Sequence, residues 1–324
     1  MKDETLDEQK VGPGYVHRID LAPSAGHTTS DVSWLHMCIK HAETAAYLVD
    51  VEHLDRFIAD AMLREETRSR IVAHDDGVMV LLKAMRQGEG FRPEDMISLR
   101  VWIDADRVIT TREADVDPIM DLREQLALGK GPSTSAGFLA DLIDAHLAEV
   151  DSTVDALEKA VAGLDAHRLV DRDQGEKACG ELASCSLTIA GLMRHLSPQR
   201  VVLERLTGLS YHFVADRHRA RWGEALDTLL LLLESLQSLS DRIAIVSAQA
   251  QRMQDRHQAR FSQLLSVVAG AFLPTTFVTG LLGMNVAGIP LADHPLAFAS
   301  VAVACVVFAT VTLYYLGRRR WWHS

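Results

Sequence analysis

Residues 261–316 read FSQLLSVVAGAFLPTTFVTGLLGMNVAGIPLADHPLAFASVAVACVVFATVTLYYL. The runs 261–282 and 295–316 each contain 22 residues and no Asp, Glu, Lys or Arg. A helix of that length measures about 33 Å, enough to cross the roughly 30 Å hydrocarbon core of a bilayer. The loop 283–294 is too short for a domain, so both chain ends must lie on one side. We therefore predict a C-terminal hairpin of two transmembrane helices, 261–282 and 295–316.

Basic residues flank this hairpin. Arg252, Arg256 and Arg260 precede the first span, and Arg318–Arg320 lie in a basic tail, 317–324. The loop between the spans carries a single formal charge, Asp293. The positive-inside rule therefore predicts that both ends are cytoplasmic and that the loop faces outward. The N-terminus is polar and acidic, unlike a signal peptide, so we expect the hairpin itself to direct insertion.

The first span is more polar than a lipid-facing anchor requires. It contains Pro274, whose missing N–H frees a carbonyl group that protein or water must satisfy. It also contains one amide and five hydroxyl side chains: Gln263, Ser262, Ser266, Thr275, Thr276 and Thr279. These features favour a helix that lines a path through protein. A plain anchor that only tethers the preceding domain is the alternative.

The remainder of the chain is strongly acidic. The net charge is −11, and residues 1–282 carry −13 because the charges after Gly283 are Asp293 and the three arginines of the tail. Nucleic acid is excluded as a partner, since phosphate binding needs clustered Lys and Arg. The acidity would instead concentrate cations near an opening, or serve only solubility. The four cysteines form no CxxC pair, which favours a reducing compartment.

Residues 1–132 have the pattern of an α/β subdomain. Residues 1–30 are expected to form a tail or a loose first strand, and the turn Asp75-Asp76-Gly77 joins two strands. Helical spacing is found at Val51–Leu63 and at Asp117–Leu128, which is followed by Gly129, Gly131 and Pro132. The predicted strands are Val32–Lys40, Arg70–His74, Val78–Met85, Ile97–Asp104 and Arg107–Thr111.

Residues 133–260 are predicted to be helical throughout. An apolar stripe predicts one helix over Ser133–Ala166, and a second is expected over Glu176–Leu196, ended by Pro198. A third begins near Phe213 and continues into the first span for about 70 residues, or roughly 100 Å. A helix of that length favours an oligomeric bundle, although an ordinary monomeric helical domain would also fit residues 133–260.

The sequence FLPTTFVTGLLGMN at 272–285 resembles the end of the first span and the GMN signature of the CorA metal-ion transporters. Gly288-Ile289-Pro290 and the segment 92–102, RPEDMISLRVW, are similar to the zinc-transporting ZntB branch. The resemblance implies a funnel-shaped homopentamer in the bacterial inner membrane, with five long helices around a pore. It assigns Asn285 to an outer selectivity ring, with Gly283 and Met284 shaping the loop.

The resemblance also implies the cargo. The ZntB-like segments imply zinc uptake, with or without coupling to protons. A methionine in the middle of the GMN tripeptide, here Met284, is usual in magnesium-type members of the family. A channel for Mg²⁺, Co²⁺ or Ni²⁺ is therefore the alternative. No resident cofactor is implied.

One face of the long helix is predicted to line the pore. Counting back from Asn285 in helical steps gives Thr276, Leu273, Leu265 or Ser266, Ser262 and, below the membrane, Asp255. The stripe contains no His or Cys, and its oxygen atoms suit an ion that must leave again. Leu273 and Leu265 would be apolar constrictions or ordinary packing. Asp255 would form a cation-attracting ring or a solvated face. The alternative for the Thr276 hydroxyl is a hydrogen bond to its own helix only.

Other candidate ligands are scattered. His212, Asp216 and His218 are close in sequence and are candidates for a metal site in the soluble part. Asp293 and His294 in the outer loop would capture ions or link transport to protons, if they do not simply form a polar turn. The chain has no GxSxG, HExxH, Walker or GxGxxG motif, so we expect no enzyme. A membrane-tethered regulatory or scaffold protein is the non-transporting alternative.

Overall fold

The structure, a computed structural model, describes residues 9–10, 16–23, 31–40, 43–64, 68–86, 92–113, 116–171, 173–284 and 295–320. The chain divides into two compact units, Met1–Val246 and Ser247–Ser324. The first unit contains a sheet and most of the helices. The second contains the C-terminal part of one very long helix and the helix that follows it. This agrees with the predicted order of an α/β region followed by long helices.

A seven-stranded sheet forms the centre of the first unit, in the order β1-β2-β3-β7-β6-β5-β4. All neighbouring strands are antiparallel except β3 and β7, which are parallel. The strand bounds are β1 Gln9–Lys10, β2 Val16–Asp20, β3 Ser33–Cys38, β4 Arg70–His74, β5 Gly77–Met85, β6 Met96–Ile103 and β7 Arg107–Arg112. The five strands predicted from the sequence are all present. β2 lies in the segment expected to be a tail or loose strand.

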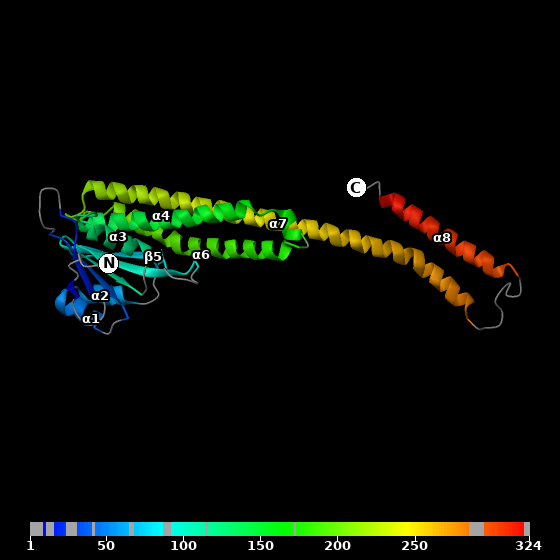
Figure 1. Ribbon diagram of the computed structural model, residues 1–324, viewed down its shortest axis with the longest axis horizontal. Coiled ribbons are helices and arrows are strands. Elements are labelled where there is room, and N and C mark those ends of the chain that lie inside the picture. The colour runs from blue at the N-terminus through cyan, green and yellow to red at the C-terminus, as the bar shows by residue number, and fades with distance from the viewer. Residues whose placement is uncertain are drawn as a thin grey trace, which may run out of the picture. The chain divides into compact units, whose positions relative to one another are not determined.

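The two faces of the sheet are covered by different helices (Figure 1). Along β5, Val78 and Val80 face the larger core while Met79 faces the smaller one, as the two-residue period of a strand requires. The smaller core is closed by α1 (Thr44–Ala46), the π-helical turn η1 (Tyr47–Val51) and α2 (Arg56–Leu63). The larger core packs against α3 (Asp117–Ala127), α4 (Ser135–Ala162), α6 (Gly175–Thr207) and the start of α7.

The prediction of one helix over Val51–Leu63 was wrong, because residues 52–55 break it. His53 has a positive φ of 50°, and Asp55 accepts a hydrogen bond from the Phe57 N–H at 2.8 Å as the N-cap of α2. Glu52 turns inward instead, with a side chain 4% exposed, and forms ion pairs with Arg18 and Arg107. The break therefore places a buried charge beside the sheet.

The helix predicted to end before Pro198 continues for nine residues beyond that proline, since α6 ends at Thr207. A proline inside a helix removes one backbone hydrogen bond. The residues after it compensate: Val202, Leu203 and Leu206 are buried in the larger core, and the Gln199 amide donates to the Lys83 carbonyl at 2.9 Å. The burial of these side chains and this bond outweigh the cost of the backbone hydrogen bond that Pro198 removes. Hydropathy alone does not reveal these tertiary contacts.

Two other helix ends differ from expectation. The predicted helix Ser133–Ala166 stops at Ala162, where Gly163 follows, and a short helix α5 (Ala166–Val170) begins after the N-cap Asp165. The long helix α7 begins at Asp216 rather than near Phe213 and runs without interruption to Leu282. The expectation of a single helix from the soluble part to the end of the first apolar run is confirmed.

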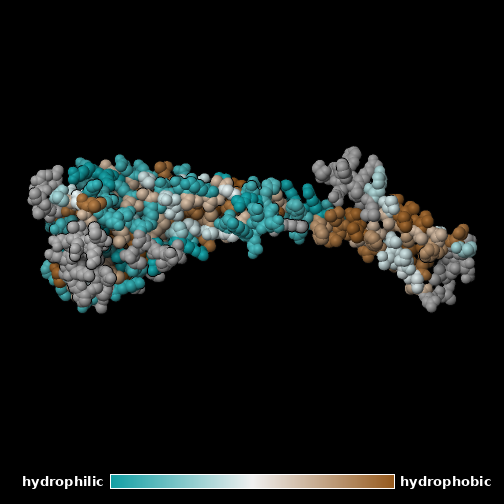
Figure 2. Space-filling model, viewed as in Figure 1, coloured by the Kyte–Doolittle hydropathy of each residue, from teal (hydrophilic) through white to brown (hydrophobic). Residues whose placement is uncertain are grey.

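The second unit is apolar on its outside. Hydrophobic residues gather on the C-terminal part of α7 and on α8 (Ala297–Arg320), as Figure 2 shows. Phe272, Leu273 and Phe277 are each about two-thirds exposed. α7 is long and apolar enough to cross a membrane, whereas the apolar stretch found in the described part of α8 is shorter, Phe298–Thr312. Exposed apolar surface of this extent indicates a membrane or protein interface.

Candidate ion pathway

The predicted pore stripe lies on one continuous helix. Thr276, Leu273, Leu265, Ser262 and Asp255 all belong to α7. At 3.6 residues per turn their Cα atoms fall within about 80° of one another around the helix axis. All five are exposed in the single chain. The stripe is therefore available to face neighbouring copies or a lumen.

Hydroxyl groups near the stripe differ in how they are bonded. Thr275 donates to the Ala271 carbonyl at 3.0 Å, and Thr279 donates to the Thr276 carbonyl at 3.1 Å. Ser266 likewise donates to the Ser262 carbonyl at 3.0 Å. Within the described residues the Thr276 hydroxyl donates no such bond to its own helix. A hydroxyl in that condition is free to offer an oxygen to a passing hydrated ion.

Asp255 has a partner on its own helix. The Gln251 amide donates to the Asp255 carboxylate at 3.1 Å, one turn earlier on α7. The bond orients the carboxylate without neutralising its charge. Asp255 is thus held in one position on an exposed face.

The GMN signature is partly visible. The Gly283 N–H donates to the Thr279 carbonyl at 2.9 Å, so the helical hydrogen bonding of α7 extends to this glycine. Met284 follows with a half-exposed side chain. Asn285, Asp293 and His294 lie outside the described residues. The roles predicted for these three residues stay predictions.

Among the described residues, the candidate ligands His212, Asp216 and His218 form no group that could hold a metal ion. His218 is buried: its Nδ1 atom accepts the Ala215 N–H at 3.2 Å, near the start of α7. Burial and the neighbouring guanidinium groups of Arg217, Arg221 and Arg219 lower the pKa of His218. Asp216 forms an ion pair with Arg219. His218 and Asp216 are thus used to build the start of α7, while His212 lines a separate pocket.

That pocket was not predicted. It lies where β4, β6 and the η1–α2 loop end, and it contains His53 and His74 besides His212. These residues are far apart in sequence, so no motif spacing could have grouped them. The acidic turn Asp75-Asp76-Gly77 is the one local signal, and its sequence predicts only a connection between two strands.

These observations define a class of protein. A domain of one sheet and several helices is followed by α7, whose C-terminal part is apolar and exposed. The chain belongs to the CorA family, because residues 29–319 match the family described as CorA-like Mg²⁺ transporter protein. The family predicted from the GMN signature is confirmed.

Two relatives extend over nearly the whole chain. The divalent cation transporter CmaX of Pseudomonas aeruginosa is 32% identical over 321 residues, which cover 97% of this chain and 92% of the relative. The zinc transport protein ZntB of Yersinia enterocolitica is 28% identical over 321 residues, covering 99% and 97%. The solved structure of full-length CmaX matches with a TM-score of 0.76 at 32% identity, over 90% of this chain and 89% of that one.

Proposed function

We propose that this protein is a multi-pass transporter that carries divalent cations across the bacterial inner membrane, with zinc as its principal cargo. The observation that carries the proposal is α7, an unbroken helix of 67 residues that starts in the sheet domain and ends at Gly283-Met284 as an exposed apolar segment. A relative named a divalent cation transporter and another named a zinc transport protein support the choice of cargo.

The pathway requires several copies of the chain. One helix cannot enclose a pore, and the stripe residues Asp255, Ser262, Leu265, Leu273 and Thr276 are all exposed among the described residues of the second unit. Five copies of α7 arranged as a bundle would bring the stripe to a common axis. The segments 261–282 and 295–316 are then the two spans, 283–294 is the outer loop, and both ends of the chain, including the tail 317–324, are cytoplasmic.

The chemistry of this pathway suits a hydrated ion. Asn285 would present amide oxygens at the outer mouth, and Thr276 and Ser262 would present hydroxyl groups further in. Such ligands attract a divalent ion through its water shell without the tight closed coordination that Cys and His give zinc. Leu273 and Leu265 would form apolar constrictions that gate by dewetting. Asp255 would concentrate cations at the inner mouth.

Metal flux into liposomes tests the proposal. The purified protein should admit Zn²⁺ above the rate of empty liposomes, and Asn285→Ala should reduce that flux, whereas Ser300→Ala in α8 should not. Entry of Mg²⁺, Co²⁺ or Ni²⁺ without Zn²⁺ would show the magnesium-type alternative that Met284 favours. No flux of any divalent ion would show the regulatory or scaffold alternative.

Two further measurements test the number of chains in the pore and the coupling of transport to protons. The mass of the protein in detergent should equal five chains, and a monomer would contradict the pore. An imposed pH gradient should change zinc flux if transport is coupled to protons, and unchanged flux would remove the coupling while leaving the transporter intact.

A further inference from the structure

A set of imidazole and carboxylate side chains gathers in the first unit, and none of them belongs to the predicted pore stripe. It surrounds a pocket of about 740 Å³ at the end of the sheet. The loop before α2 contributes His53 and Asp55, and the β4–β5 turn contributes His74 and Asp75. The β6–β7 turn contributes Asp106, and the connection between α6 and α7 contributes His212. Four separate segments therefore place imidazole and carboxylate groups around one space.

His74 is the centre of this cluster. Its Nε2 atom lies 3.3 Å from an Asp75 carboxylate oxygen and 3.7 Å from an Asp55 carboxylate oxygen. The same nitrogen is buried and has no hydrogen-bond partner among the described residues. It is thus an imidazole nitrogen between two acids, with its ring beside Phe57 at a centroid distance of 6.5 Å.

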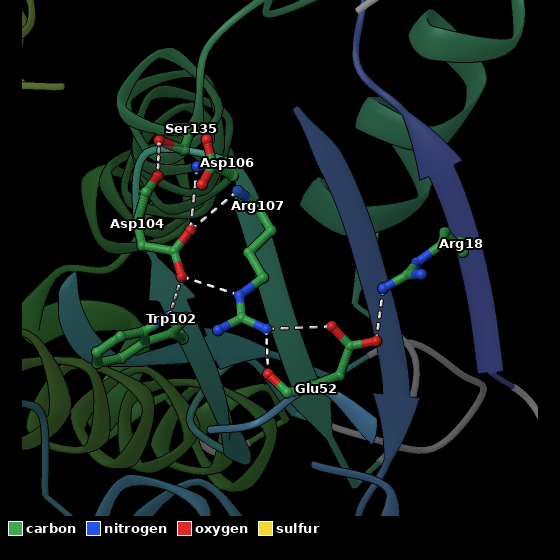
Figure 3. Close-up of polar contacts among 7 residues, drawn as sticks. All are labelled: Arg18, Glu52, Trp102, Asp104, Asp106, Arg107 and Ser135. Carbon is green, nitrogen blue, oxygen red and sulfur yellow. Dashed lines mark hydrogen bonds and ion pairs between the residues drawn. The ribbon is translucent and has the colours of Figure 1, made fainter. Parts of the chain in front are cut away.

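The guanidinium group of Arg107, at the edge of the pocket, is paired with Asp104 and Glu52 (Figure 3). Arg107 is the single Arg or Lys among the described residues that line the pocket. Its Nε donates to Asp104 at 2.9 Å, and its Nη1 lies 3.3 Å from a Glu52 carboxylate oxygen. Asp104 also accepts from the Trp102 indole at 3.0 Å. Among the described residues that line the pocket, Asp55, Asp75 and Asp106 therefore have no Arg or Lys partner, and the basic group beside Asp55 and Asp75 is the His74 imidazole.

The backbone of the pocket holds its residues in uncommon positions. His53 and Asp75, with φ of 50° and 41°, are the two residues other than glycine that have positive φ in the described part of the chain. Both line this pocket. The α6–α7 connection reaches the same place, since His212 lines the pocket together with His74. The cluster is thus built by the fold and not by one mobile loop.

We propose that this pocket is a binding site for a divalent cation of the zinc class, ligated by His74, by His53 or His212, and by Asp55 or Asp75. Imidazole with carboxylate is a ligand set for Zn²⁺, Co²⁺ and Ni²⁺, whereas Mg²⁺ prefers oxygen ligands alone. In the described residues no group of three such side chains already converges to hold an ion. The Asp75 carboxylate already lies 3.3 Å from His74 Nε2, and the His53 and His212 side chains at the pocket are exposed, so an ion can reach all of them from solvent.

Binding would link two parts of the fold. His212 lies four residues before Asp216, where α7 begins, and His74 ends β4. An ion held by both would fasten the start of the long helix to the edge of the sheet. The site does not depend on the transport proposed above, because every ligand belongs to the first unit.

Histidine footprinting tests the site on the full-length protein in detergent. Diethyl pyrocarbonate modifies exposed histidines, and mass spectrometry reports each one separately. Zn²⁺ should protect at least one of the exposed His53 and His212, while exposed His167 on α5 should stay equally reactive. Mg²⁺ at the same concentration should protect none of them. Equal modification of His53, His74 and His212 with and without Zn²⁺ would overturn the proposal, whatever the pore binds.

A spectroscopic measurement supplies the affinity. Co²⁺ bound by imidazole and carboxylate absorbs in the visible range, and Zn²⁺ should displace it. His74→Gln should weaken this binding by about 10- to 100-fold or more, since loss of an outer partner of a ligand already costs that much. His167→Ala is the matched control and should bind as the wild type does. If His74→Gln keeps both its thermal midpoint and the full Co²⁺ spectrum, the proposal is wrong. If it unfolds, the double variant His53→Ala/His212→Ala, at two exposed positions, decides: it should lose the Co²⁺ spectrum, and an unchanged spectrum would overturn the proposal.

Discussion

The Trp102 ring lies directly on Gly77: a Cβ atom on this glycine would come within 2.2 Å of the Trp102 Cζ2 atom. The indole is almost fully buried and donates to Asp104 at 3.0 Å, so it is fixed from both sides. Gly77 begins β5 just after the acidic turn. The turn that carries His74 and Asp75 is therefore positioned by a contact that tolerates only a hydrogen atom.

Gly77→Ala should destabilise the protein by about 2 kcal/mol, because the methyl group forces the buried indole or the turn to move. A thermal midpoint measured in detergent reports the loss. Gly180→Ala is the control: this glycine lies inside α6 with nothing within 4 Å of an added Cβ. There alanine should stabilise by roughly 0.5–1 kcal/mol. Equal shifts for both variants would contradict the contact.

Arg107→Met should destabilise by about 3 kcal/mol, because it leaves the buried Glu52 carboxylate with one ion-pair partner fewer and frees Asp104. Thermal unfolding measures the effect. Arg200→Met removes an arginine from an exposed pair with Glu204 and should change stability by less than about 1 kcal/mol. If Arg107→Met also loses less than about 1 kcal/mol of stability, the ion pairs of Glu52 contribute little.

Glu149→Gln should alter the dependence of stability on pH. Burial, followed by the nearby Asp117 and Asp121, raises the Glu149 pKa from 4.5 to about 7. The folded state then holds a proton that the unfolded state has lost, so this residue makes stability fall as pH rises from about 4.5 to about 7. The variant should be more stable than wild type above pH 7 by about 1 kcal/mol, a figure reduced because the side chain is partly exposed. The two should converge toward pH 4.5.

The comparison must be made between variant and wild type, because His146 works in the opposite direction. Burial lowers the His146 pKa from 6.5 to about 4, which makes stability rise with pH across that interval. Its contribution is common to both proteins and cancels in the difference. Glu158→Gln, on the exposed side of α4, should reproduce the wild-type profile. A constant difference between Glu149→Gln and wild type from pH 4.5 to 8 would contradict the assignment.

Asp255→Asn should slow divalent cation entry two- to threefold at low ionic strength, if five copies surround the inner mouth as proposed. The rate difference should vanish near 1 M salt, where the Debye length falls to about 3 Å. Asparagine keeps the shape and can still bond Gln251. Asp151→Asn, on the exposed surface of α4, should have no effect at either salt concentration. A salt-independent loss would indicate a structural role for Asp255 instead.

Strands and long helices were predictable because their apolar pattern matches their burial. β5 alternates between two cores, and the stripe of α4 faces the sheet. The errors fell where tertiary contacts oppose local signals. Pro198 does not end α6 because the following turn is buried, and Glu52 interrupts a helical pattern because its charge is paired with residues 34 and 55 positions away.

The candidate sites divide in the same way. The stripe on α7 follows from helix periodicity alone, so the sequence is sufficient to place Leu273 and Asp255 on one face. The pocket around His74 depends on a sheet that brings residues 53, 74, 106 and 212 together. Local pattern contains no such information, and the one group proposed from spacing, His212 with Asp216 and His218, forms no metal-holding cluster among the described residues.

The parallel pairing of β3 with β7 sets the order in which the ribosome's product can fold. β4 to β7 form an uninterrupted antiparallel meander, each strand beside its predecessor. β3 has no place in the sheet until β7 exists, and Trp34 pairs in register with Val108, which is synthesised much later. The β3–β7 contacts therefore join segments about 74 residues apart in the chain, and they can form only after residues 107–112 have been synthesised.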